Sequence, residues 1–310
     1  MKLSQLRTFV SIADSGGFAR GAARVRLTQS AASRQIASLE QELDVALFER
    51  IGRRVQLTSE GDDLLKRARR LLADADAFGD RARALRGAES GTLRVSARPQ
   101  VIETFIAPFL PRYLNGSPGV EVQLIDSGRA RQIGQLDRGE IHLAVMAWGI
   151  ERFENRLLYP IHALAAMSRN HRLRKDSALE IAKLADEPVL ILNRDFGVRA
   201  WFDAACDNAR VTPRVILESE SPHMILALAR FGHGIAVVPS NVDTVPSGVC
   251  VRPLIHRGQS VGRWSMIAWN RERFLAPYAK RFVNELVDEA ERAFPGRNLI
   301  RRSPPLSRPG

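Results

Sequence analysis

Apolar residues recur every three or four positions through the first part of the chain, which is the spacing of amphipathic helices. The pattern predicts helices over residues 3–14, 18–26 and 29–43. A tight turn at Leu27 and Thr28 separates the last two, and the Thr28 hydroxyl is suited to capping the helix that follows. From residue 51 to residue 58 apolar and polar positions alternate, which predicts a small β-hairpin.

A longer helix is predicted over residues 62–86, where no proline interrupts the chain. Its apolar positions are spaced by four and three, which makes a heptad stripe of about three repeats. The stripe consists of Leu64, Ala68, Leu71, Ala75, Phe78, Ala82 and Leu85. A helix docked on its own domain can carry the same stripe, but this helix joins two segments and has a charged outer surface. We therefore interpret it as a dimerisation helix, with Leu64, Leu71, Phe78 and Leu85 as contacts.

Glycines at residues 87 and 91 mark a break, and after them strand-like runs alternate with helical patterns as in α/β folds. The predicted domains are 1–58, a linker helix over 59–90, and an α/β domain over 91–300. Residues 301–310 are rich in arginine and proline, which predicts a basic, disordered tail.

The second helix of the predicted pair has a polar face opposite its apolar stripe. This face presents Gln29, Ser30, Ser33 and Arg34. Short hydroxyls, an amide and a guanidinium suit the major groove of double-stranded DNA, so the two helices are interpreted as a helix-turn-helix. At the hairpin, Arg50, Arg53 and Arg54 are suited to phosphates or the minor groove. The alternative is a solvated polar face on an ordinary pair of helices.

Composition narrows the class of protein. The formal net charge of +12 favours an anionic partner without separating nucleic acid from a membrane surface. The two cysteines, Cys206 and Cys250, make no disulfide framework or metal spacing, and Cys206 is interpreted as a buried apolar residue rather than a redox sensor. Without a signal sequence or a membrane span, we expect a cytoplasmic protein that needs no metal or other cofactor. No catalytic motif is present, and we expect no enzyme activity.

Several short motifs appear in fixed order along the first part of the chain. They are Leu6-Arg7-Thr8-Phe9, Ala22-Ala23, Gln29 to Ile36, Leu39-Glu40, Leu47 to Arg50 and Leu57 to Gly61. Together they closely resemble the winged helix-turn-helix of LysR-type transcriptional regulators. Gly21, Ser30 and Asp44 depart from the usual residues of that pattern, and neither Gly21 nor Asp44 removes an expected DNA contact.

The resemblance implies an N-terminal winged helix-turn-helix that binds double-stranded promoter DNA, and a linker helix that pairs antiparallel with that of another subunit. It further implies a two-lobed α/β effector-binding domain similar to periplasmic solute-binding proteins. Lobe 1 is expected over 91–162 and 265–300, and lobe 2 over 163–264. We expect a homodimer or homotetramer that works with RNA polymerase. A solute-binding protein and an α/β enzyme are the alternative classes, disfavoured by the basic head and by the missing catalytic motifs.

In two-lobed α/β folds, ligands bind where strand ends and helix N-termini converge between the lobes. The candidate effector-binding residues are Arg98, Gln100, Ser127, Arg129, Trp148, Phe196, Arg199 and Ser221. Because three of them are arginines, we expect a small anionic effector such as a carboxylate. Arg98 stands where the family often has a hydroxyl residue, which leaves that usual contact open. The competing interpretation pairs these arginines with local acids such as Asp126, Asp195 or Glu220.

Overall fold

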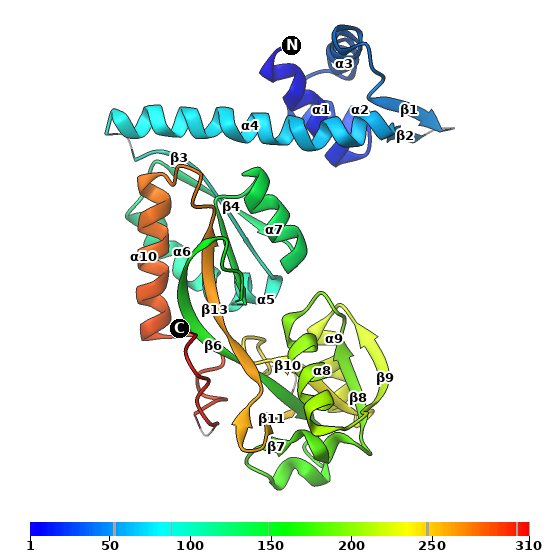
Figure 1. Ribbon diagram of the computed structural model, residues 1–310, viewed down its shortest axis with the longest axis vertical. Helices are drawn as coiled ribbons and strands as arrows, with labels where there is room; N and C mark the ends of the chain where they lie inside the picture. Colours follow the sequence, from blue (N-terminus) through cyan, green and yellow to red (C-terminus); the bar gives the residue numbers. More distant parts are fainter. Residues whose placement is uncertain (52–53, 88, 148, 246–247, 302, 310) are drawn as a thin grey trace. The chain divides into compact units, whose positions relative to one another are not determined.

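The structure is a computed structural model that describes residues 1–310 except 52–53, 88, 148, 246–247, 302 and 310 (Figure 1). The chain divides into two compact units. Unit 1 comprises Met1–Ala88 with Asp137–Glu140, and unit 2 comprises Glu89–Leu136 with Ile141–Gly310. Along the described chain, no helix combines the length and the apolar character that crossing a membrane requires.

Unit 1 contains three short helices, a hairpin and one long helix (Figure 1). In chain order these are α1 (Leu3–Ser15), α2 (Phe18–Arg24), α3 (Gln29–Leu43), β1 (Phe48–Ile51), β2 (Arg54–Leu57) and α4 (Ser59–Leu85). The strands pair antiparallel from Phe48 opposite Leu57 to Ile51 opposite Arg54. This arrangement is the predicted winged helix-turn-helix with its long following helix.

Local chemistry sets the ends of α3 and α4. The Thr28 hydroxyl accepts a hydrogen bond from the Ala31 amide at 3.2 Å, and Asp44 ends α3 with a left-handed φ of 52°. Thr58 caps α4 in the same way, accepting from the Gly61 amide at 2.9 Å. Because of this cap, α4 begins at Ser59, as the linker helix expected over 59–90 does, and not at residue 62, where the apolar periodicity alone placed its start.

The core of unit 1 is built by the apolar faces that the sequence indicates. It consists of Leu6, Phe9, Ile12, Ala22, Ala32, Ile36, Leu39, Leu47, Leu65 and Ala68. The Phe48 ring at the start of the hairpin lies edge-on to Phe9 and Phe18, each with centroids 5.5 Å apart. These contacts hold the hairpin against α1 and α2.

Lobe 1 of unit 2 is a mixed sheet with helices packed on it (Figure 1). Its elements are β3 (Gly91–Ala97), α5 (Pro99–Val101), the π-turn η1 (Ile102–Ile106), α6 (Ala107–Asn115), β4 (Val120–Asp126), α7 (Arg129–Arg138), β5 (Leu143–Ala147) and α10 (Pro277–Arg292). Strand β3 lies between β4 and β5 and is parallel to both. The buried core is aromatic, with Phe109 and Tyr113 set edge-on to Phe282 of α10.

Lobe 2 is also a sheet with helices packed on it, and it has a separate hydrophobic core. Its elements are η2 (Arg172–Lys175), β7 (Leu179–Glu180), η3 (Ile181–Leu184), β8 (Pro188–Leu192), α8 (Gly197–Ala209), β9 (Arg214–Ser219), α9 (Pro222–Arg230), β10 (Ile235–Pro239), β11 (Cys250–His256) and β12 (Gln259–Ser260). Strand β8 lies between β9 and β10 and is parallel to both. The α/β class predicted for this part of the chain is confirmed.

Two long strands, β6 (Glu154–Met167) and β13 (Gly262–Trp269), run between the lobes (Figure 1). They pair antiparallel with a bulge between Trp264 and Met266. Strand β6 changes partners midway, because His162 pairs with β13 whereas Ala163 pairs with β10. These two strands are therefore the structural link between the lobes.

The chain after α10 differs from the expected disordered tail. Gly296 makes a turn with φ of 79°, and Leu299 and Ile300 then pack on the core of lobe 2 rather than lobe 1. Further along, the Pro304 carbonyl accepts from the Ser260 hydroxyl at 2.6 Å, and the Leu306 carbonyl accepts from the Trp264 indole at 3.4 Å. Apolar residues between the arginines hold this segment on β12 and β13, although it has no regular secondary structure.

Candidate DNA interface and effector cleft

The polar face of α3 is open to solvent. Gln29, Ser30, Ser33 and Arg34 are all exposed, whereas Ala32 and Ile36 on the opposite face are buried. Arg34 makes no ion pair with any residue that the structure describes, so its guanidinium is free to meet another molecule. The neighbouring Gln35 is different, since its amide oxygen accepts from the Thr8 hydroxyl at 2.7 Å and so ties α3 to α1.

The hairpin that follows α3 carries the other predicted DNA contacts. Arg50 on β1 lies opposite Val55, and Arg54 on β2 lies opposite Ile51. Their side chains, and the whole of Arg53, lie outside what the structure describes. The predicted contacts at these three arginines remain predictions.

A small cavity of about 70 Å³ lies between the lobes of unit 2. Lobe 1 contributes Arg98, Gln100, Val101, Arg129, Gln132 and the end of β5, and lobe 2 contributes Asp195 to Val198, Trp201, Pro239 and Asn241. Ile161 of β6 and Ser265 of β13 complete the lining. Four predicted effector residues, Arg98, Gln100, Arg129 and Phe196, are thus brought together.

Two arginines on the cavity wall have no carboxylate partner among the residues described. Arg129, at the start of α7, donates to the carbonyls of Ala147 at 2.6 Å and Gly149 at 3.2 Å. Burial lowers the pKa of its guanidinium, because no acid offsets the loss of hydration. Arg98, in the loop after β3, donates to the Asp195 carbonyl at 2.9 Å. Carbonyl oxygens leave the positive charge of both side chains uncompensated.

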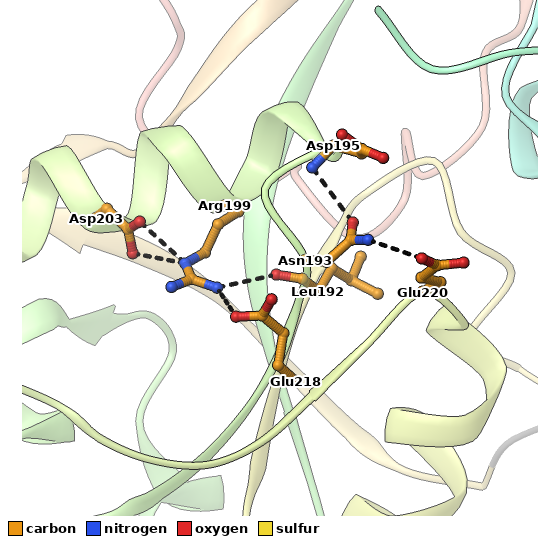
Figure 2. Close-up of polar contacts among 7 residues, drawn as sticks. All are labelled: Leu192, Asn193, Asp195, Arg199, Asp203, Glu218 and Glu220. Atoms are coloured by element: carbon orange, nitrogen blue, oxygen red, sulfur yellow. Dashed lines mark hydrogen bonds and ion pairs between the residues drawn. The ribbon is translucent and has the colours of Figure 1, made fainter.

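Arg199 has a different environment, which Figure 2 shows. Its Nε lies 2.9 Å from both carboxylate oxygens of Asp203, and its Nη1 donates to Glu218 at 2.5 Å. Burial acts to lower the Arg199 pKa, but the hydrogen bonds to Glu218 and Asp203 outweigh it and raise the pKa. Arg199 is therefore neutralised within lobe 2, as the competing interpretation proposed, although by acids other than those it named.

The remaining predicted effector residues lie elsewhere. The Ser127 hydroxyl is buried and bonded to Gln135 at 2.9 Å, and Ser221 caps α9 by accepting from the Met224 amide at 3.3 Å. Neither they nor Arg199 line the cavity, whereas Trp148 lies outside the described residues. Sequence reasoning missed Gln132, Asn241 and Ser265, whose only local signal is a polar residue in or beside an apolar segment.

The described part of the chain gives little support for metal binding or for a reactive cysteine. There, no group of three or more His, Cys, Asp and Glu side chains could hold a metal ion. Cys206 is buried in α8, and burial raises its thiol pKa to about 12, with Asp203 and Asp207 adding to the rise. A thiol with so high a pKa is almost wholly protonated near neutral pH and reacts slowly.

Comparison with known proteins identifies both domains. The model of the bacterial regulatory helix-turn-helix proteins of the lysR family matches residues 3–62, and the LysR substrate binding domain model matches residues 86–291. The chain therefore belongs to the LysR family of transcriptional regulators. It is a DNA-binding regulator with a helix-turn-helix and an effector-binding domain, in a family of regulators rather than enzymes.

Individual relatives extend the likeness over most of the chain. The HTH-type transcriptional regulator ClcR of Pseudomonas putida is 33% identical over 260 residues, which cover 79% of this chain and 85% of ClcR. TfdS of Cupriavidus pinatubonensis is 32% identical over 255 residues, covering 79% and 84%. Full-length CbnR, solved in complex with its target DNA, is 25% identical with a TM-score of 0.67, covering 93% of this chain and all of CbnR.

Proposed function

We propose that this regulator reads promoter DNA through the exposed face of α3 and responds to a small anionic effector bound between the lobes. Gln29, Ser30, Ser33 and Arg34 are the proposed major-groove contacts, and Arg50, Arg53 and Arg54 of the hairpin are proposed to meet phosphates. The observation that carries this proposal is the solvent-exposed polar face of α3 on a buried apolar support.

The long helix α4 supports a dimer. Three residues of the predicted stripe are exposed in the single chain: Leu71 at 46%, Phe78 at 79% and Leu85 at 73%. Leu64, by contrast, is partly buried against the core of unit 1. An exposed apolar stripe of this spacing suits a helix of a second copy, so α4 is the proposed dimerisation element. A dimer presents two recognition helices, as paired half-sites in DNA require.

Uncompensated Arg98 and Arg129 on the cavity wall support an anionic effector, since guanidinium groups bind carboxylates through paired hydrogen bonds. An effector that touches both lobes stabilises whichever arrangement binds it more tightly. We propose that the resulting change in lobe arrangement alters how the regulator works with RNA polymerase at a promoter in the cytoplasm.

The DNA assignment is tested by measuring the affinity of the full-length protein for an operator selected from random DNA. Ser33→Ala and Arg34→Ala should each weaken binding by about 1–3 kcal/mol if the side chain contacts a base. Arg131→Ala, at an exposed position of α7, is the matched control. Unchanged operator affinity in both α3 variants, with folding intact, would refute the assignment.

The effector assignment is tested by calorimetry on the full-length protein with a panel of small carboxylates and neutral analogues. Arg98→Gln and Arg129→Gln should each remove most of the affinity for an anion. Arg199→Gln changes an arginine of the same unit that is already paired with Asp203 and Glu218, so its effect on the anion should be small. Ligands that prove neutral or cationic would contradict the proposal.

A further inference from the structure

The chain after α10 makes a third connection between the lobes. We call residues 293–301 and 303–308 the C-terminal strap, which Figure 1 draws in red beyond α10. Helix α10 packs in the core of lobe 1, and the strap begins on the same core. There the Phe294 ring stacks on Tyr159, with centroids 5.6 Å apart and an angle of 2° between the ring planes. The first residues of the strap are therefore attached to lobe 1.

The strap next passes the point where β6 crosses between the lobes. Gly296 turns the chain with φ of 79°, and a Cβ built on it would collide with the Ser240 carbonyl oxygen. Ser240 follows β10 and is bonded twice to His162, because its amide donates to the His162 carbonyl at 2.8 Å and its hydroxyl accepts from the His162 amide at 3.1 Å. Since β6 changes partners at His162, the Gly296 turn lies on the hinge between the lobes.

The rest of the strap is attached to lobe 2 and to the crossing strands. Leu299 and Ile300 pack against the core of lobe 2. Beyond them, the Pro304 and Leu306 carbonyls accept hydrogen bonds from side chains of β12 and β13. One segment therefore contacts lobe 1, the hinge and lobe 2 in turn.

Such a segment restricts how far the lobes can rotate. A hinge of two strands allows rotation when only a few residues in the crossing segments change conformation. A third connection opposes that rotation, because opening the lobes pulls on the contacts at both ends of the strap. Turns within the strap are closed by hydrogen bonds of 2.9 Å from the Leu299 amide to the Gly296 carbonyl and from the Ser303 amide to the Ile300 carbonyl. The strap can lengthen at these turns only by breaking those bonds.

We infer that the strap limits the angle between the lobes and holds the cleft at the width at which Arg98 of lobe 1 meets Phe196 of lobe 2. A ligand that binds a wider arrangement must break strap contacts and therefore binds less tightly than it would without the strap. The LysR substrate binding domain model matches the chain up to residue 291, so the strap lies beyond the matched range. The inference concerns the lobes alone and does not depend on which ligand binds between them.

The test measures the distance between the lobes by double electron–electron resonance in the full-length protein. Spin labels are placed at the exposed positions Arg131 of α7 and Asn208 of α8 by substitution with cysteine. Both helices begin at the cavity wall, so the labels report on opening of the cleft. Cys250→Ser removes the more accessible native thiol, whereas Cys206 is buried. Diluting labelled chains with unlabelled ones confines the measurement to distances within one chain.

Two variants release the strap at separate points. Gly296→Ala forces the turn away from Ser240, and Leu299→Asp places a charge against the core of lobe 2. Each should lengthen or broaden the distance between the labels by more than about 2 Å, the size of a hinge rearrangement. Because the variants act at separate points, one that fails to fold leaves the other as the test.

Each variant has a matched control. Gly258→Ala adds the same methyl group to another glycine with a left-handed φ, of 73°, where no described atom lies within 4 Å of the added Cβ. Asn298→Asp introduces the same acid at an exposed position beside Leu299. Both controls should keep the parent distance distribution. A parent-like distribution in the folded release variants would overturn the inference, and so would equal broadening in the controls.

Discussion

The guanidinium carbon of Arg98 lies 4.1 Å from the centre of the Phe196 ring. Arg98 follows β3 in lobe 1, whereas Phe196 precedes α8 in lobe 2 and is 5% exposed. The same guanidinium donates to the backbone carbonyl of Asp195. Arg98 thus joins the two lobes at the wall of the cavity. An anion bound there would change the contacts that Arg98 makes with lobe 2.

A double-mutant cycle between Arg98 and Phe196 should therefore show coupling. We expect Arg98→Met and Phe196→Leu to be non-additive by about 0.5–2 kcal/mol in urea unfolding of the full-length protein, as cation–π pairs at partly desolvated sites are. The control pair is Arg112 and Phe109 of α6, whose guanidinium lies 5.5 Å from the ring and which does not line the cavity. Variants of this control pair should leave effector affinity unchanged. Additive effects at Arg98 and Phe196 would show that the contact does not join the lobes.

The exposed stripe of α4 makes a prediction about assembly. Leu71→Asp places a charge in the apolar stripe and should split the dimer, weakening operator binding with it, because burying an unpaired charge is costly. Arg70→Asp introduces the same acid at a neighbouring exposed position outside the stripe and should leave the dimer intact. Sedimentation velocity at micromolar concentration measures both. A parent oligomer that persists in Leu71→Asp would exclude this interface.

The helices of unit 1 could be predicted because their signals are local. The apolar spacing and the Thr28 cap identify α3, and the resemblance of the first part of the chain places it in a winged helix-turn-helix. The apolar periodicity alone placed the start of this helix at residue 62, three residues late, because the cap at Thr58 was not used; the linker helix expected over 59–90 has the observed start at Ser59.

The cleft could be predicted only in part. Strand ends indicated Arg98 and Arg129, but Asn241 and Ser265 reach the cavity from elements that no local pattern connects. The ion pairs of Arg199 could be predicted only in part: Asp203 lies four residues later on the same helix, at a spacing that allows an ion pair. Glu218 lies on a neighbouring strand, and only the pairing of β8 with β9 brings it to the guanidinium.

The segment after α10 should be held by Leu306. A Cβ built on Gly262 would lie 2.9 Å from the Leu306 side chain, so this glycine leaves room for the leucine against β13. Leu306→Asp should release the segment and make the bond between Arg301 and Arg302 several-fold more sensitive to trypsin. Pro305→Ala changes an exposed neighbour and should keep the parent cleavage rate. Equal cleavage of Leu306→Asp and the parent would mean that the segment is not anchored there.

The buried His162 should make the stability of the fold depend on pH. It lies where β6 passes between the lobes, is 2% exposed, and its Nδ1 bonds to no residue in the described ranges. Burial lowers the pKa of its imidazole to about 4 from its usual value of 6.5, so the folded protein holds it neutral near pH 7. The unfolded chain therefore binds more protons than the folded chain between these two pKa values, and stability rises with pH across this window.

Lowering the pH from 7 to 4 should consequently cost up to about 3 kcal/mol through this one residue. His162→Gln removes the titrating group and should flatten the dependence of unfolding free energy on pH, most clearly between pH values of about 4 and 6.5. His233→Gln changes an exposed histidine and should follow the parent profile. Urea unfolding of the three proteins at a series of pH values provides the measurement. If His162→Gln loses stability on acidification as steeply as the parent, other groups cause the acid sensitivity and the buried imidazole contributes nothing to it.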